Sequence, residues 1–227
     1  TVNTEIQLPA SGELNYTTIN IPTGVTVKFK KNTANTPIYV LASGDVTVAG
    51  KIDITGEDGR PTGTYGDGAL GDDGVPGASG PGGFDGGRGG REDAGLRADI
   101  VRAGSGLGPG GGKGGVEGGD GCSTNAGYFP AEGSGAGYAT NAYKRLAVSQ
   151  CGNPRPADWI GGKSYGSALL QPLIGGSGGG GGRGGVTYPG TGGGGGGGAI
   201  LLASSGTLRV TGSIDATGGD GGGIAGT

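Results

Sequence analysis

The sequence predicts an all-β protein with little or no helix, in which a stacked β-strand layer (β-solenoid or sandwich-like) is joined to a bundle of glycine-rich polyproline II helices. Three observations support this prediction: short apolar runs near both ends, a strand–turn unit that occurs twice, and glycine at every third position between them. The chain has 64 glycines and 12 prolines in 227 residues. Backbone contacts therefore have to supply much of the packing, since glycine brings no side chain and loses the most conformational entropy.

Residues 5–56 are expected to form strands. The runs EIQL, LNYTTINI, VTVKFK and IYVLAS are rich in β-branched and aromatic residues. Turn signals such as PASG (9–12) and PTG (22–24) separate them. The stretch DVTVAGKIDITG then follows with apolar residues at alternate positions, which is typical of a half-buried strand.

A strand–turn unit occurs twice in the chain. GDVTVAGKIDITGEDG at 44–59 aligns with GTLRVTGSIDATGGDG at 206–221, and the shorter string LAS also repeats, beginning at Leu41 and at Leu202. Matching units of this kind indicate stacked β architecture. We expect the two copies to lie side by side, which would bring the chain ends together and make the middle of the chain an insertion.

Glycine then sets a period of three. The triplets begin at Gly68 and end at Arg91, and shorter runs in phase follow within 112–121, 175–184 and 190–196. The polyproline II helix has three residues per turn, so one face of such a segment carries only hydrogen atoms and lets another backbone approach. The glycines expected to pack in this way are Gly68, Gly71, Gly74, Gly77, Gly80, Gly83, Gly193 and Gly196.

Several polyproline II segments in one chain favour a polyglycine II bundle, in which the segments are hydrogen-bonded to one another. A collagen triple helix is the first alternative, although the triplets contain only Pro76 and Pro81 and lose their phase at Glu92. Long flexible loops are the second alternative.

We expect one compact unit with three parts. Residues 1–60 and 199–227 form the β layer, 61–121 and 175–198 form the bundle, and 122–174 form an aromatic insert. The insert is a candidate interaction surface, because exposed tyrosine and tryptophan are frequent binding hot spots; a small satellite core is the alternative. Its aromatic residues are Tyr128, Phe129, Tyr138, Tyr143, Trp159 and Tyr165.

The two cysteines, Cys122 and Cys151, are predicted to form a disulfide that pins this insert. Such a bond would indicate an oxidising compartment, and two buried free thiols are the alternative. The chain does not begin with methionine, from which we expect that a leader has been removed.

Catalysis is not expected. The chain has no histidine, so it lacks the base of a Ser-His-Asp or Cys-His arrangement and any histidine metal ligand. GGSGG at 175–179 matches the nucleophile-elbow pattern only as a glycine tract would by chance, and GGKS at 161–164 lacks the first glycine of a phosphate loop. We expect no catalytic residue and no cofactor.

Carboxylates are the only candidate metal ligands. Asp58, Asp67, Asp72 and Asp73 are weak candidates for calcium, which prefers oxygen donors, and solvated turn acids are the favoured interpretation. Asp53 and Asp215 occupy equivalent positions in the repeated unit. They are expected to cap turns or to form a ladder between stacked strands.

The string IPTGVTVKF…VLASGDVTVAGKIDITG, followed by PLIGGSGGGGG and GGGGGGGAILLASSGTLRVTGSIDATGGDGG, carries a resemblance over nearly the whole chain. It resembles glycine-rich exported proteins of environmental bacteria, some of them labelled as gliding-motility or surface proteins. The resemblance implies export and a β-rich shell, and it transfers no catalytic residue. The glycine segments are also similar, in backbone arrangement only, to the bundles of certain phage tail adhesins and of a glycine-rich antifreeze protein.

These observations favour a secreted structural protein. The net charge of −3 and the lack of a long basic block argue against nucleic acid, and no apolar run approaches the roughly 20 residues of a membrane helix. We expect a homopolymer, an extracellular filament or biofilm matrix at the cell surface, joined through strand edges or termini. The alternative is a surface or phage-tail adhesin that binds a receptor or glycan. Ice binding is weaker because threonines are few, and an enzyme is the least expected class.

Overall fold

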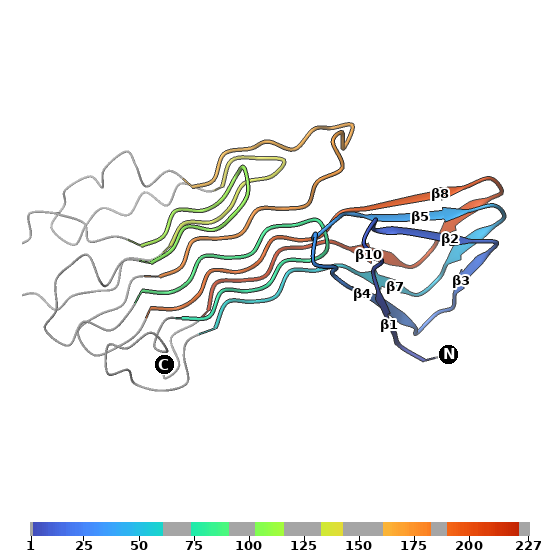
Figure 1. Cartoon of the computed structure of the whole chain (residues 1–227), viewed down its shortest axis with the longest axis horizontal. Helices are drawn as coiled ribbons and strands as arrows, with labels where there is room; N and C mark the ends of the chain where they lie inside the picture. Colours follow the sequence, from blue (N-terminus) through green and yellow to red (C-terminus); the bar gives the residue numbers. More distant parts are fainter. Residues whose placement is uncertain are drawn as a thin grey trace, which may run out of the picture.

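The computed structural model describes residues 2–60, 74–90, 103–115, 133–142, 161–182 and 190–222. Within these residues the chain forms strands and extended segments and no helix, which confirms the predicted strand-rich class. Figure 1 shows the strands gathered at one end, with extended segments running side by side away from them.

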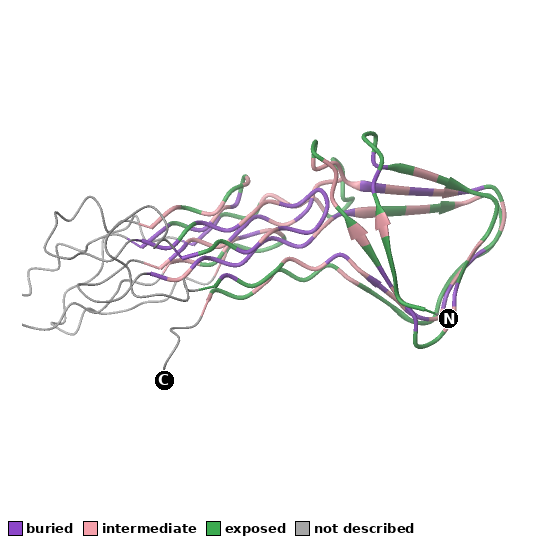
Figure 2. Cartoon of the chain, turned by 60° about the horizontal axis from the view of Figure 1, so that its bottom comes forward, coloured by how far each residue is buried: buried purple, intermediate pink, exposed green. Residues whose placement is uncertain are grey.

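The strands form three stacked parallel sheets, which we call the strand coil. The sheet orders are β1–β4–β7–β10, β2–β5–β8 and β3–β6–β9. Because consecutive strands belong to successive sheets, the chain winds around a common axis and lays each turn on the one before, with the triangular outline seen in Figure 2. The strands are β1 (Thr4–Gln7), β2 (Glu13–Tyr16), β3 (Ile19–Ile21), β4 (Thr26–Lys30), β5 (Ile38–Ala42), β6 (Val46–Val48), β7 (Lys51–Asp53), β8 (Ile200–Ser204), β9 (Leu208–Val210) and β10 (Ser213–Asp215).

Alternate side chains of the inner strands fill the middle of the strand coil. In β5, Ile38, Val40 and Ala42 are buried, whereas the residues between them are half-buried, as the period of two in a strand requires. Val46 and Val48 of β6, with β7, continue the same core. Full burial of each valine or isoleucine contributes about 1.5–3 kcal/mol, so the central turns supply most of the hydrophobic stabilisation.

The two copies of the repeated unit lie side by side, as predicted. β6 pairs with β9 and β7 with β10, in a parallel register that places Ile52 beside Ile214. The match of Leu41 with Leu202 is wrong, because Leu41 pairs with Ala203. A shift of one residue would turn every side chain of a strand to the other face, so β8 keeps the register of the longer repeat.

The expectation that the chain ends meet is also wrong. β1 and β10 lie at opposite edges of their sheet, with β4 and β7 between them. The glycine-rich residues are nevertheless an insertion, since they lie between β7 and β8. One turn earlier, residues 31–37 make the corresponding connection between β4 and β5.

Backbone hydrogen bonds between the inserted segments recur at every third residue. Residues 190–199 donate one set of bonds to residues 81–90 and a second set to residues 54–60. The first donors are the N–H groups of Gly190, Gly193, Gly196 and Ala199, which donate to the carbonyls of Gly90, Gly87, Phe84 and Pro81. The second donors are Gly192, Gly195 and Gly198, which donate to Arg60, Glu57 and Ile54.

Residues 190–198 are the central segment of the insertion. Their carbonyls accept hydrogen bonds from residues 74–80, 176–182 and 219–222. A Cβ added at any glycine of 192–198 would lie closer than 3.0 Å to backbone of a neighbouring segment. The expectation that one face is closed, with Gly193 and Gly196, is therefore too narrow, because neighbouring segments close several sides of residues 190–198.

Outer segments keep the expected period of three. In residues 74–80 a Cβ at Gly74, Gly77 or Gly80 would lie within 3.0 Å of neighbouring backbone, whereas Val75 and Pro76 are exposed. Gly83 is closed in the same way by the carbonyls of the central segment. Gly68 and Gly71 lie outside the described residues.

Candidate functional site

The last turn of the strand coil, β8 to β10, has uncovered inward-facing side chains. Leu208, Val210 and Ile214 are 46%, 43% and 39% exposed. The residues beside them one turn earlier, such as Val46 at 1% and Ile52 at 2%, are buried. Each of β8, β9 and β10 also lies at the edge of its sheet within the described residues, so its outer backbone groups lack a strand partner there.

The first turn of the strand coil is uncovered in the same sense. β1, β2 and β3 form the opposite edges of the three sheets. Ile6, Leu14 and Ile19 pack only partly against the core, and Tyr16, which lies beside Ala42, is 39% exposed. Among the described residues, both ends therefore present unpaired strand edges and apolar side chains, which is the arrangement that favours strand addition.

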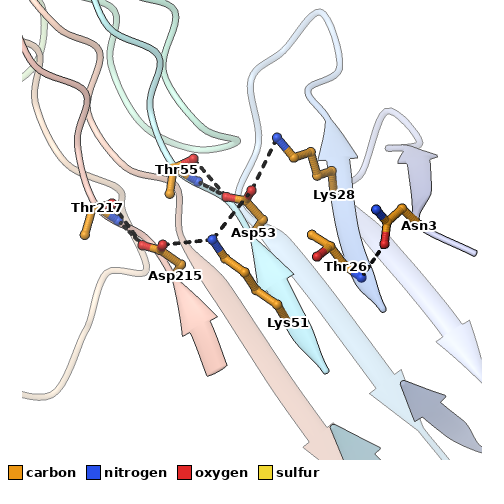
Figure 3. A network of polar contacts seen from close by, with 8 residues as sticks. All are labelled: Asn3, Thr26, Lys28, Lys51, Asp53, Thr55, Asp215 and Thr217. Carbon is orange, nitrogen blue, oxygen red and sulfur yellow. Dashed lines mark hydrogen bonds and ion pairs between the residues drawn. The ribbon is translucent and has the colours of Figure 1, made fainter. Parts of the chain in front are cut away.

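A charge ladder runs across the outer face of the first sheet, at the end of its strands (Figure 3). Lys51 Nζ lies 3.0 Å from Asp215 Oδ2 and 3.8 Å from Asp53 Oδ2, and Lys28 Nζ lies 3.3 Å from Asp53 Oδ2. Both aspartates also cap turns. Asp53 Oδ1 accepts from Thr55 Oγ1 at 2.8 Å, and Asp215 Oδ1 accepts from Thr217 Oγ1 at 2.9 Å. The two roles expected for Asp53 and Asp215 thus occur together.

This ladder shifts the pKa values of its members. Partial burial by itself raises the pKa of Asp53, but hydrogen bonds from Thr55 and the ammonium of Lys28 outweigh it and hold the pKa below its ordinary value. The hydrogen bond from Lys51, with those from Thr217, lowers the pKa of Asp215. The same bond to Asp215 raises the pKa of Lys51. All three groups are held in their charged forms, which suits a structural ladder.

A polar joint holds the glycine segments against the strand coil. Asn35 Nδ2 donates to the carbonyl of Gly83 at 2.6 Å, and Asn35 Oδ1 accepts from Gly82 N at 3.1 Å. Lys31 Nζ lies 2.7 Å from Asp85 Oδ1, which also accepts from Ser79 N at 2.7 Å. Burial raises the pKa of Asp85, but the bonds from Lys31 and Ser79 outweigh this and lower it. Sequence reasoning missed this joint, because no local pattern links residues 54 positions apart.

Two of the six candidate aromatic residues lie within the described residues and pack on each other. The rings of Tyr138 and Tyr165 meet edge to face, with centroids 5.2 Å apart. Tyr138 Oη donates to the carbonyl of Ile174 at 3.1 Å, and Tyr165 Oη donates to that of Gly175 at 2.6 Å. Burial raises the pKa of Tyr165, although its hydrogen bond with Ser177 lowers it. Tyr128, Phe129, Tyr143 and Trp159 lie outside the described residues.

The candidate calcium ligands do not form a cluster in the described part of the chain. Asp58 Oδ1 accepts a hydrogen bond from Asp220 N at 2.7 Å and so links two neighbouring segments. Asp67, Asp72 and Asp73 lie outside the described residues, as do Cys122 and Cys151. Among the described residues, no three aspartate, glutamate, cysteine or histidine side chains gather in a way that could hold a metal ion.

Comparison with protein-family models, curated proteins and solved structures found no match. The described part of the chain contains no helix with the length and apolar character needed to cross a membrane.

Proposed function

We propose that this protein is a secreted structural subunit that self-assembles head to tail into an extracellular filament or surface matrix. In this proposal the strand coil is a β-solenoid and the glycine segments are a polyglycine II bundle. The single observation that carries the proposal is that both end turns of the strand coil are uncovered, with strand edges and apolar side chains exposed at each.

The backbone bonding of the glycine segments supports the bundle. The bonds recur at every third residue and join segments that are distant in the chain. A three-residue period is that of the polyproline II helix, which makes no bonds within itself and leaves its backbone groups free for neighbours. Such a bundle is a stiff unit that a filament subunit can project from its axis.

The two end turns support polymerisation. All strand pairs in the coil are parallel, so the β1–β3 edges of one copy have the orientation needed to continue the β8–β10 edges of another. Two different surfaces meet in this contact. A contact of that kind, repeated without closing a ring, gives an open fibre.

Negative-stain electron microscopy with light scattering tests the proposal. We expect filaments whose mean length grows with protein concentration, and whose axis follows the strand coil. A protein that stays monomeric at millimolar concentration would exclude this function. Fractionation of the source cells, with mass spectrometry for a Cys122–Cys151 disulfide, tests the secreted location.

An adhesin is the second candidate function, and one observation favours it. The described glycine segments end together at the side of the bundle remote from the strand coil (Figure 1). In the sequence, the stretches 116–132 and 143–160 contain the four aromatic residues Tyr128, Phe129, Tyr143 and Trp159. Whole-cell pull-down and glycan binding distinguish this function, since an adhesin binds as a monomer and a filament subunit does not need a receptor.

A further inference from the structure

A groove runs along the glycine segments, between residues 176–180 on one side and 216–221 on the other. Residues 193–198 form its floor, and its volume is about 630 Å³. A cavity needs about 10–15 Å³ on this measure to hold one water, so the groove is far larger than a packing defect. Its walls and floor are mostly backbone.

The floor of the groove presents unpaired backbone donors. The N–H groups of Gly194 and Gly197 have no hydrogen-bond acceptor among the described residues, although both glycines are buried. Their neighbours on the same segment are paired, since Gly193 donates to Gly87 and Gly195 donates to Glu57. Buried backbone groups are almost always hydrogen-bonded. Unpaired N–H groups three residues apart therefore indicate that a neighbouring segment is missing on this side of the central segment.

One wall presents unpaired acceptors with the same spacing. Within the described residues, the carbonyls of Ser177 and Gly180 accept no hydrogen bond. The other carbonyls of residues 176–182 accept from neighbouring segments, Gly179 from Gly87 and Gly178 from Gly112. Donors on the floor and acceptors on the wall therefore both recur at every third residue.

Gly179 and Gly221, which line the groove, have room for a side chain within the described structure. A Cβ added at Gly179 would have its nearest atom at 3.6 Å, and one added at Gly221 would meet nothing within 4 Å. At the central glycines a Cβ would lie within 3.0 Å of backbone. The chain thus leaves side chains out where its own structure has room for them, which indicates that another backbone comes close.

The arrangement of neighbours defines the shape of that backbone. The central segment is bonded to residues 54–60, 74–80, 81–90, 176–182 and 219–222, and adjacent members of this ring are bonded to each other except where the groove separates 176–182 from 219–222. A helix with three residues per turn points its N–H groups in three directions and its carbonyls in three more. It therefore has six neighbour positions, and the groove is the sixth.

We propose that the groove is a docking site for one glycine-rich strand of a partner polypeptide in the polyproline II conformation. This inference rests on the proposed polyglycine II bundle. The strand's carbonyls accept from Gly194 and Gly197, its N–H groups donate to Ser177 and Gly180, and glycine faces the floor at least at every third position. Recognition is by backbone bonds, as when a peptide adds a strand to a sheet.

The partner is a separate glycine-rich chain rather than a second copy. The described glycine segments of this chain are already bonded into their own bundle, so a second copy would have to release one. A strand without such bonds of its own has no protein hydrogen bonds to break on docking and loses only its hydration and its freedom of motion.

The test uses the full chain and a fluorescent peptide, PGGFDGGRGG, which copies residues 81–90. This segment is chosen because its carbonyls already accept from another N–H set of the central segment. We expect saturable binding, with slowed amide exchange at Gly194 and Gly197. Gly179→Leu, which places a side chain in the groove, lowers the affinity at least tenfold. Pro76→Leu on the exposed side, and a peptide with alanine at its third, sixth and ninth residues, are the controls.

The outcomes separate this inference from the filament. Absence of peptide binding while the Gly193 amide exchanges slowly would overturn the docking site and leave the bundle intact. Fast exchange at Gly193 as well would remove the bundle, and the docking site with it. Protection of Gly194 that rises with protein concentration, without peptide, would place a second copy in the groove and overturn the partner strand. These three results are interpreted in the same way whether or not the protein forms filaments.

Discussion

The glycines of residues 192–198 are needed for the space around them and not for their backbone angles. None has a φ in the left-handed region, in contrast to Gly12, Gly24, Gly82 and Gly108, where φ is between 74° and 96°. At Gly193 and Gly196 the limiting atoms are the carbonyl oxygens of Gly179 and Gly176. These oxygens belong to backbone that is bonded in place, so it cannot move aside for a methyl group.

Gly193→Val and Gly196→Val are therefore expected to lower the free energy of unfolding by about 3 kcal/mol or more, the upper end for overpacking. Thr191→Val is the matched control, because its half-buried site already holds a β-branched side chain, and its cost is expected to stay under about 1 kcal/mol. Thermal and denaturant unfolding measure both. Equal tolerance at all three positions would mean that the central segment is only a linker.

Acid is expected to weaken the fold through Asp53, Asp85 and Asp215, whose pKa values are lowered in the folded chain. A lowered folded pKa gives stability that is present above the ordinary value of about 3.9 and is lost as the pH falls through the folded pKa. The denaturant midpoint should therefore drop below about pH 4. Asp53→Asn should flatten this dependence, and an unchanged slope would contradict the role of the ladder. The raised pKa of Lys51 acts at the other extreme, where its contribution is lost above about pH 10.4.

At the scale of elements, the strands and their pairing follow from local patterns. The alternation in β5 and the repeat shared by β6–β7 and β9–β10 predict both the strands and their register, since a one-residue slip would expose the apolar face. The packing of the glycine segments is harder to predict in this way. The three-residue period of glycine predicts that another backbone approaches each segment, but it does not say how many sides of the segment have such a neighbour.

The difference between inner and outer turns predicts a difference between two isoleucines that lie side by side. Ile52→Ala, at 2% exposure, should cost about 2–5 kcal/mol of stability, whereas Ile214→Ala, at 39% exposure, should cost clearly less in the monomer. Denaturant unfolding at low protein concentration checks this. If the two costs are equal in the monomer, the last turn is covered by other parts of the chain.

At the scale of the whole molecule, the proposed head-to-tail stacking would bring charged side chains of two copies together. Register carried through β1, β4, β7 and β10 places Glu5 of one copy beside Asp215 of the next. Like charges on adjacent strands oppose pairing, and opposite charges favour it, by about 0.2–1 kcal/mol each.

The polar joint of Lys31, Asn35 and Asp85, which no local pattern predicts, holds the glycine segments in a fixed direction relative to the strand coil.

Glu5→Lys is therefore expected to lower the critical concentration for filament growth by about tenfold, since two such terms sum to roughly 1.4 kcal/mol. Glu13→Lys is the control, because the same register places residue 13 beside the uncharged Leu201. Sedimentation of polymer across a concentration series measures the effect. An equal response to both variants would exclude this contact.

The insertion between β7 and β8 has a consequence for how such a chain changes in length. Because the bonds between segments repeat at every third residue, a segment lengthened by one or two residues would lose its alignment with all its neighbours at once. In the proposed polyglycine II bundle, residues added in threes would extend the segments by about 9 Å per triplet and leave each existing bond where it is. The reach of this molecule can thus grow in fixed increments, while the strand coil stays unchanged.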